Sequence, residues 1–102
     1  MDLNKVVKEL IEYPTEANWF EFKVNWYEPN GIGEYISSLA NAAAMGGREC
    51  GYLVWGVDND SHEIVGTSFN YRTTVRNEPL EHYLARQIVP DNSFSFHEIM
   101  IE

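Results

Sequence analysis

The segment between residues 16 and 66 constrains the fold most strongly, because the spacing of its apolar residues changes twice along the chain. Residues 19–25 alternate between apolar and polar side chains, which is typical of a strand with one buried face. Residues 32–45 are rich in Ala and Ser, carry apolar residues at helical spacing and predict a helix that packs closely on a sheet. Residues 52–57 are almost continuously apolar and predict a buried strand. This order favours an α+β fold in which helices pack against a mixed or antiparallel sheet.

Weaker patterns on both sides of this segment predict further elements. A helix over residues 3–13 is expected to begin at an Asp2 cap and to end before Pro14. The acidic residues that follow the apolar strand predict a turn at 58–61, and residues 62–67 then form the returning strand of a hairpin.

The last third of the chain predicts one more helix and one more strand. Asn77 is expected to cap a helix that runs to Ile88 and is ended by Pro90. Residues 94–101 read as a strand. No partner for that strand follows, so we expect residues 1–102 to form a single domain that is the N-terminal part of a longer protein.

The charge balance restricts the partners. The chain has 7 Lys and Arg against 16 Asp and Glu, a net charge of −9, which opposes binding to phosphate backbones. No apolar run approaches the roughly 20 residues that span a bilayer and no signal peptide is visible, so we expect a cytoplasmic protein without a membrane partner. The single cysteine, Cys50, excludes an internal disulfide and has no zinc-type spacing to a histidine, and we expect it to be buried or half-buried.

Acidic residues at two predicted strands are candidates for chemistry. Glu21 lies in mid-strand beside Lys23, whereas Asp58 and Asp60 follow the end of the buried strand. Carboxylates that converged there would bind Mg²⁺ or Mn²⁺, which prefer hard oxygen ligands and activate water next to a phosphate. The simpler interpretation gives Glu21 and Lys23 a solvated strand face and leaves the aspartates to make turn hydrogen bonds. The residues alone favour the simpler interpretation.

Aromatic and basic residues offer a second kind of site, for nucleic acid. Trp26 and Tyr27 lie in a predicted loop, where exposed rings can stack on bases. The basic residues are scattered, and four of them make the candidate phosphate-binding patch: Lys23, Arg48, Arg72 and Arg76. Isolated arginines are more often surface ion pairs, and the histidines form no pattern, so we assign the histidines no role.

A series of short motifs resembles the AlbA_2 domain, which occurs in Schlafen proteins and in many bacterial regulators. The motifs extend over nearly the whole chain: Glu16, Glu21-Phe22-Lys23, Ala40-Asn41, Gly46-Gly47, Gly56-Val57-Asp58 and Ile64-Val65-Gly66. Together they are fairly specific, although no single one is. The chain departs from the family pattern in the connection from helix to strand, where Asn41 lies further from the glycine pair and Arg48-Glu49-Cys50 intervenes.

The resemblance implies an α+β sandwich and a role in binding DNA or RNA, in transcriptional regulators or next to helicase-like segments. In Schlafen proteins a related domain is a metal-dependent ribonuclease with two glutamates and one aspartate in its site. Glu16, Glu21 and Asp58 match these residues in type and approximate spacing. The resemblance therefore implies that these three would be the catalytic and metal-binding residues, with Mg²⁺ or Mn²⁺ as the ion.

Three functions stay open from the sequence. The leading hypothesis is a nucleic-acid-binding domain, for DNA in the first place, of a bacterial transcriptional regulator or helicase-related protein. The second is a metal-dependent endoribonuclease of the Schlafen type, so the sequence does not decide whether the protein is an enzyme. The third is a protein-interaction or oligomerisation module, with a homo-oligomer as one form, that binds nucleic acid poorly, as the net charge of −9 favours. The downstream domains of the same protein are expected partners in each case.

Overall fold

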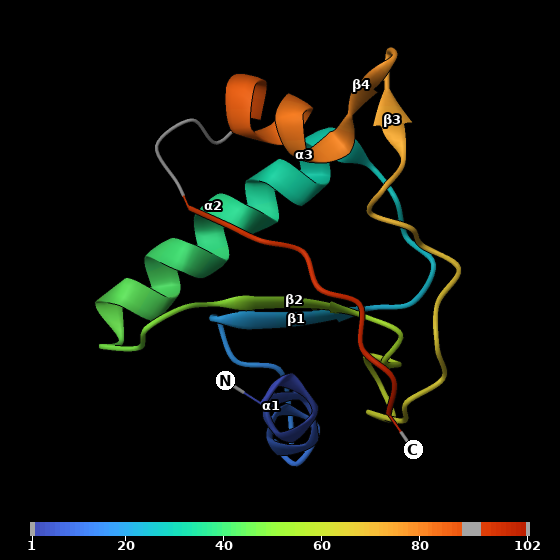
Figure 1. Cartoon of the computed structure of the whole chain (residues 1–102). Coiled ribbons are helices and arrows are strands. Elements are labelled where there is room, and N and C mark those ends of the chain that lie inside the picture. Colours follow the sequence, from blue (N-terminus) through green and yellow to red (C-terminus); the bar gives the residue numbers. More distant parts are fainter. Residues whose placement is uncertain (1, 89–92, 102) are drawn as a thin grey trace.

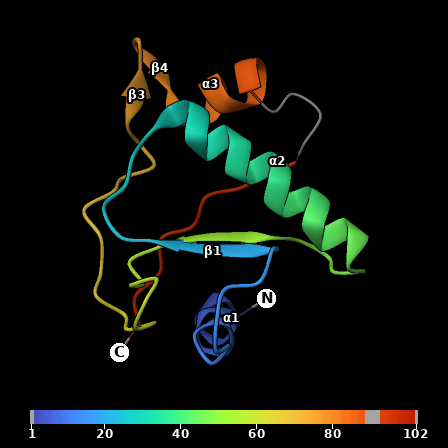
Figure 2. The ribbon, with the colours of Figure 1, turned by 180° about the vertical axis from the view of Figure 1, so that it is seen from behind.

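The computed structural model describes residues 2–88 and 93–101, and a pair of parallel strands lies at its centre (Figure 1). Strand β1 (Phe20–Lys23) pairs in parallel with β2 (Tyr52–Trp55). Helix α2 (Pro29–Met45) joins the two strands, because a parallel pair needs a crossover connection. Figure 2 shows the same arrangement from behind, with α2 on one side of the strands and the first helix on the other.

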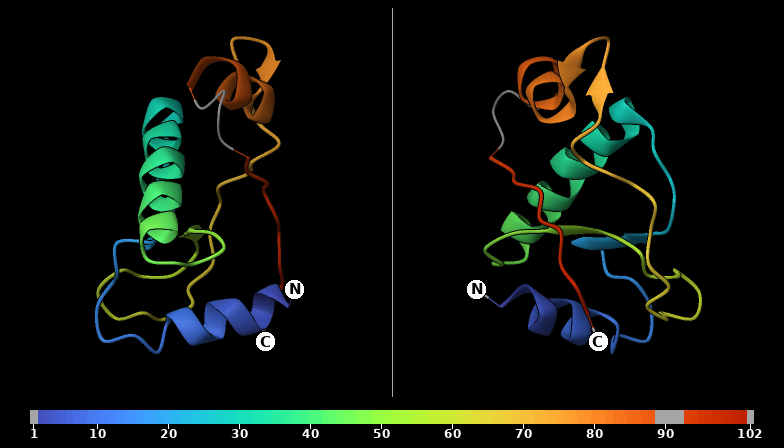
Figure 3. Two further views of the ribbon diagram at one scale, coloured as in Figure 1. Left: turned by 90° about the vertical axis from the view of Figure 1, so that its left-hand side faces the viewer. Right: turned by 45° about the vertical axis from the view of Figure 1, so that its right-hand side comes forward.

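Figure 3 shows the layers of the ribbon from two other sides. Two apolar clusters hold these layers together, one on each face of the strands. The first cluster joins helix α1 (Leu3–Leu10) to the sheet through its buried residues, which are Val7, Leu10, Phe20, Phe22 and Val57. The second joins α2 to the last helical segment through Ile32, Leu80 and Leu84. Because side chains alternate along a strand, Glu21 and Lys23 lie on the face of β1 opposite to α1.

The α+β fold predicted from the sequence is confirmed, and so is the Asp2 cap of α1. The Asp2 carboxylate accepts a hydrogen bond from the Lys5 N–H at 3.3 Å. Helix α1 ends earlier than predicted, at Leu10. Strand β2 is half-buried rather than buried, because a sheet of two strands leaves much of each strand uncovered. Within the described residues, no helix has the length and apolar character needed to cross a membrane.

Helix α2 begins earlier than predicted, because its first turn contains residues that read as a loop. The Glu28 carboxylate caps the helix by accepting hydrogen bonds from the N–H groups of Asn30 and Gly31, at 3.2 and 2.5 Å. Pro29 takes the first helical position, where its missing N–H costs nothing. The predicted helix start at residue 32 is therefore wrong, and the loop that contains Trp26 and Tyr27 ends before Pro29, whereas the predicted helix end at residue 45 is confirmed.

The predicted returning strand at residues 62–67 is wrong as a regular strand. The tight turn is present, since the Asp58 N–H donates to the Glu63 carbonyl at 2.9 Å. Only one antiparallel bridge follows, between Val57 and Ile64. Positive φ angles at three positions interrupt the extended backbone: 106° at Gly56, 61° at His62 and 80° at Gly66.

The predicted helix cap at Asn77 is also wrong. Asn77 lies in the turn of a hairpin between β3 (Thr74–Val75) and β4 (Glu78–Pro79), with a φ of 68°. The helix α3 (Leu80–Tyr83) follows directly and has no side-chain cap, and it continues as the π-helical turn η1 (Leu84–Ile88). The helix end predicted at Pro90 lies outside the described residues.

The C-terminal segment is extended but forms no strand between residues 93 and 101, so the strand predicted there is wrong. Phe94 and Phe96 pack against the second apolar cluster, and Ile99 and Ile101 pack against the first. Side-chain packing, rather than a ladder of backbone hydrogen bonds, therefore places this segment across the molecule.

The prediction that Cys50 is buried or half-buried is wrong, because its side chain is exposed. It lies in the connection between the end of α2 and the start of β2, whose residues 46–50 are all exposed. The expected buried environment is absent because no element covers this connection within the described part of the chain.

The close approach of α2 and β2 at Gly51 leads to a first prediction. A Cβ atom at residue 51 would lie 2.6 Å from the backbone oxygen of Leu39 in α2. Gly51→Ala should therefore push α2 away from the strands and lower the free energy of unfolding by about 1–3 kcal/mol, measured by urea denaturation. Gly46→Ala is the matched control, since the nearest atom there is 3.4 Å away and φ is −89°. Equal losses in the two variants would contradict the close contact.

Candidate functional site

The candidate site lies at the outer edge of β1, because among the described residues β1 has a strand neighbour, β2, on one side only. In place of a second neighbour, Oε2 of Glu16 accepts a hydrogen bond from the Phe22 N–H at 2.5 Å. The Val24 carbonyl accepts one from the Thr67 hydroxyl. Backbone groups on a strand need such partners when water does not reach them. The edge of the strand thus holds the Glu16 carboxylate next to the middle of β1.

Glu16 and Glu21 lie together beside this edge. The pKa of Glu21 is raised above its ordinary value of 4.5, first by partial burial and second by the negative charge of Glu16. The positive charge of Lys23 acts in the opposite direction, and a hydrogen bond with the Glu16 carboxyl raises the pKa further. The raised pKa means that the Glu21 carboxyl holds its proton more tightly than an isolated glutamate does.

Lys23 lies on the same face of β1, two residues further on. Its Nζ is 3.9 Å from Oε2 of Glu21. It is also 5.3 Å from the centre of the Trp26 ring and 5.2 Å from that of Tyr35, and the faces of both rings attract a cation. The ammonium group is therefore held in one place, beside a carboxylate and two aromatic rings.

Asp58 lies apart from this pair in the turn after β2. The strand register places Leu53 opposite Glu21, and Asp58 follows Leu53 by five residues. Its Oδ1 accepts hydrogen bonds from the N–H groups of Asp60 and Ser61, both at 2.9 Å, and these bonds are the main reason that the pKa of Asp58 is lowered. Across the residues that the structure describes, no three His, Cys, Asp or Glu side chains form a group that could hold a metal ion.

The basic residues proposed as a patch have separate surroundings. The Arg48 guanidinium lies 3.9 Å from the centre of the Trp19 ring, on the exposed connection after α2. Arg72 pairs with Glu98 of the C-terminal segment at 3.4 Å. Arg76 lies at the tip of the β3–β4 hairpin. The structure therefore distributes the cations over several elements and does not join them into one continuous patch.

The two aromatic residues proposed as a stacking platform differ in exposure. The Tyr27 side chain is 41% exposed and its ring lies 5.7 Å from that of Phe69. Trp26 is half-buried and packs against the second cluster, and its carbonyl accepts a hydrogen bond from Nε1 of Trp55 at 2.8 Å. Tyr27 is therefore free to stack on a base, whereas the main contact of Trp26 is with the protein.

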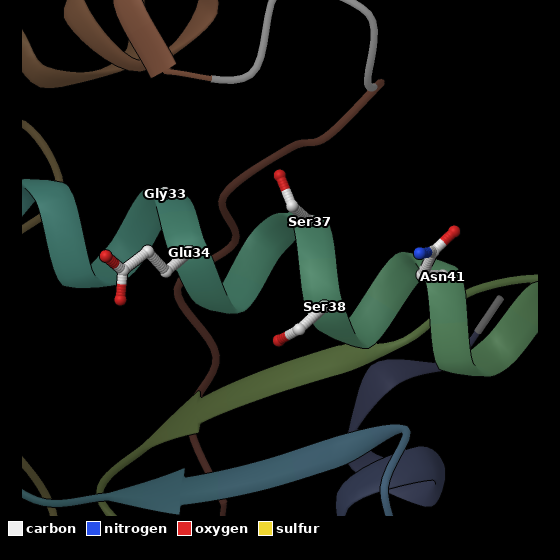
Figure 4. A pocket seen from close by; sticks show the side chains of 5 residues that line it. All are labelled: Gly33, Glu34, Ser37, Ser38 and Asn41. Atoms are coloured by element: carbon white, nitrogen blue, oxygen red, sulfur yellow. The ribbon is translucent and has the colours of Figure 1, made fainter.

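The structure also shows a shallow hollow that the sequence analysis missed. It has a volume of about 360 Å³ and lies along α2, lined by Gly33, Glu34, Ser37, Ser38 and Asn41 (Figure 4). In this view Glu34 and Ser38 project towards the side on which the strands lie, and Ser37 and Asn41 project to the other side. The sequence signal for this hollow was the helical spacing of its polar residues. Because serine is small, the same residues were interpreted as a surface that packs closely on the sheet.

The sequence analysis assigned no role to His62, but the structure gives this residue specific contacts. Its ring packs edge-on against Phe22, with centroids 5.0 Å apart, and its Nδ1 lies 3.2 Å from the carbonyl oxygen of Ile11. Because a carbonyl oxygen only accepts, Nδ1 carries the hydrogen and donates it. His62 therefore ties the turn after β2 to the end of α1, which is a structural role.

Comparison with known proteins gives one family match. The family model described as Schlafen, AlbA_2 matches residues 16–102. The matched range begins at Glu16 and contains every candidate residue discussed above, whereas α1 precedes it. No curated protein and no solved structure matches the chain.

The contact between the two glutamates leads to a prediction about titration. Glu16→Gln removes a neighbouring negative charge, so the pKa of Glu21 should fall, while burial keeps it above 4.5. Lys23→Met should raise it, because the favourable positive charge is lost. Carboxyl ¹³C NMR titration of Glu21 in the three proteins measures both changes.

The raised pKa of Glu21 also determines how this residue contributes to the stability of the fold at different pH values. Because its pKa is higher in the folded than in the unfolded protein, Glu21 stabilises the folded state below about pH 4.5, and this stabilisation is lost as the pH rises through the folded-state pKa. An unchanged Glu21 titration in the Glu16→Gln variant would show that the two carboxyl groups are not in contact.

Proposed function

The chain belongs to the Schlafen AlbA_2 family, and on this basis we propose that it is a nucleic-acid-binding domain whose central phosphate contact is Lys23. Family membership supports a nucleic-acid-binding or related role in general. The observation that carries the proposal is the position of the Lys23 ammonium group, held against Trp26 and Tyr35 on the polar face of β1.

A domain with a net charge of −9 needs a local cation if it is to bind phosphates. The two aromatic rings restrict the long side chain of Lys23 before a ligand arrives, so less conformational entropy is lost on binding. Glu21, at 3.9 Å, competes with a phosphate for the same ammonium group. Binding is therefore expected to be weak and to decrease steeply with salt.

Arg48 is a separate candidate for a phosphate contact. It stacks on Trp19, which packs against the first apolar cluster, on the face of the strands opposite to Lys23. We therefore do not include Arg48 in the Lys23 contact.

The resemblance also suggests where the domain acts. We propose a bacterial transcriptional regulator or helicase-related protein in the cytoplasm, with DNA as the first ligand to test. Downstream domains of such a protein would supply the additional positive charge that this domain lacks.

A metal-dependent endoribonuclease is the second candidate function, and the contact between Glu16 and Glu21 favours it. Two adjacent carboxylates suit Mg²⁺ or Mn²⁺, and such an ion would supply an activated water. Glu16 and Glu21 would hold it from β1 and its edge. The Asp58 oxygen that accepts two turn hydrogen bonds does not complete a three-carboxylate site in this structure.

Substitution of Lys23 tests the binding proposal. Lys23→Gln should weaken binding of a fluorescein-labelled 20-nucleotide DNA or RNA by about threefold to tenfold, and should reduce the slope of log K against log salt by about 0.7, the value for one phosphate on a single strand. Fluorescence anisotropy at salt concentrations between about 50 and 200 mM measures both quantities. Lys8→Gln on α1 makes the same change of charge at an exposed site in another layer and should have a smaller effect.

Two results would contradict the binding proposal. The first is an affinity that is equal for the wild-type and Lys23→Gln proteins. The second is tight binding that does not respond to salt, because phosphate contacts release counterions and must respond. Absence of binding together with a stable dimer in sedimentation would favour the interaction module instead.

The nuclease candidate has its own test. If it is correct, Glu21→Gln abolishes Mn²⁺-dependent cleavage of a structured RNA, because a carboxylate ligand of the ion is lost. The far-UV circular dichroism spectrum should stay unchanged, since the Glu21 side chain lies on the polar face of β1. Glu12→Gln, at an exposed position after α1, is the control and should keep full activity. Equal cleavage by the wild-type and Glu21→Gln proteins would exclude this site.

A further inference from the structure

The hairpin between β3 and β4 projects beside α3 at one end of the molecule (Figure 1), and Arg76 and Asn77 form its two-residue turn. Both residues have positive φ, 52° and 68°. A hairpin turn with two positive φ angles favours Asn-Gly or Gly-Gly, because other side chains crowd the backbone there. Asparagine tolerates this conformation, whereas arginine rarely adopts it. Such strain at an exposed charged residue suggests that the side chain is there for a function.

Arg76 differs from the other arginines in having no partner within the described part of the chain. Its side chain is exposed there and makes no ion pair, hydrogen bond or cation–π contact. The other three are each held by a neighbour: Arg48 by Trp19, Arg72 by Glu98 and Arg86 by Glu78. The tip of the hairpin therefore presents an arginine that is available to a ligand.

The base of the hairpin is fixed, so the position of the tip is fixed too. Val75 packs against the second apolar cluster, and the N–H of the buried Leu80 donates to the Thr73 carbonyl at 3.0 Å. Arg86 binds both carboxylate oxygens of Glu78, at 2.7 and 2.5 Å. This pair joins β4 to η1 and compensates the negative charge of Glu78, the carboxylate next to the turn. A phosphate at the tip is therefore not repelled by the Glu78 carboxylate as an unpaired charge.

We infer that the β3–β4 hairpin is a second nucleic-acid contact, in which Arg76 binds the phosphodiester backbone of the same ligand as Lys23. The inference rests on the proposed function. A two-stranded ribbon is narrow enough to enter the groove of a duplex, so duplex nucleic acid is the ligand that suits this element.

The test distinguishes the effect of the Arg76 charge on binding from the effect of the turn conformation. Arg76→Asn combined with Asn77→Gly creates the preferred turn sequence and removes the cation, so the variant should fold with a Tm higher by about 2–6 °C. Its affinity for a labelled 20-base-pair duplex should fall by about threefold to tenfold, and the salt slope should decrease by about 0.9. Asn77→Gly alone keeps Arg76 and should bind like the wild type. Lys5→Gln on α1 has the same net charge as the double variant and should lose less affinity.

Each result decides between the two proposals. If the double variant binds the duplex as tightly as the wild type, or loses no more affinity than Lys5→Gln, the hairpin contact is overturned while the Lys23 site stands. If the wild-type protein binds neither duplex nor single strand at low salt, the proposed function fails, and the hairpin inference fails with it. A single-stranded probe of the same length shows whether the hairpin prefers a groove, since only the duplex should then respond to loss of Arg76.

Discussion

The register between β1 and β2 is the constraint on which the rest of the molecule depends. Phe20 and Phe22 are 1% and 0% exposed, and their burial against α1 determines which face of β1 is apolar. A slip of one residue would expose both rings and turn Glu21 and Lys23 into the apolar cluster. The hydrophobic cluster thus positions the charged residues without contacting them. The glutamate pair and the lysine keep their orientation for as long as the two phenylalanines stay buried.

The elements that the sequence predicts well are those whose signals are local. The alternation in residues 19–25 and the cap at Asp2 depend on near neighbours in the chain, and both are found in the structure. The errors occur where one local signal has two meanings. Asn77 is a good helix cap and also a good residue for a turn with positive φ, and the hairpin uses the second property. For residues 94–101, the sequence predicted a strand, but a strand needs a hydrogen-bonding partner that periodicity does not show, and the segment packs through its apolar side chains instead.

The residues of the candidate site also divide into those that local sequence signals could predict and those that they could not. Glu21 and Lys23 are near neighbours on a strand, so their location on one polar face was predictable. The contact of Glu16 with the Phe22 N–H depends on how the preceding segment folds back, and only the resemblance to a family drew attention to Glu16. Asp58 makes the turn hydrogen bonds that the simpler interpretation expected. Arg76 was predicted as a phosphate-binding candidate, but the hairpin that carries it could not be located from the sequence, because Asn77 was interpreted as a helix cap.

The hydrogen bond from the Phe22 N–H to Glu16 has a consequence for self-association. An uncovered strand edge is a template on which another chain can add a strand, and natural proteins protect such edges with charge or with covering groups. Glu16 does both for β1, because its carboxylate occupies the N–H and carries a negative charge at the edge. The side chain that raises the pKa of Glu21 thus also covers a backbone donor at the edge of β1. Loss of the Glu16 carboxylate would therefore uncover this edge for pairing with another chain and change the charge beside Glu21 at the same time.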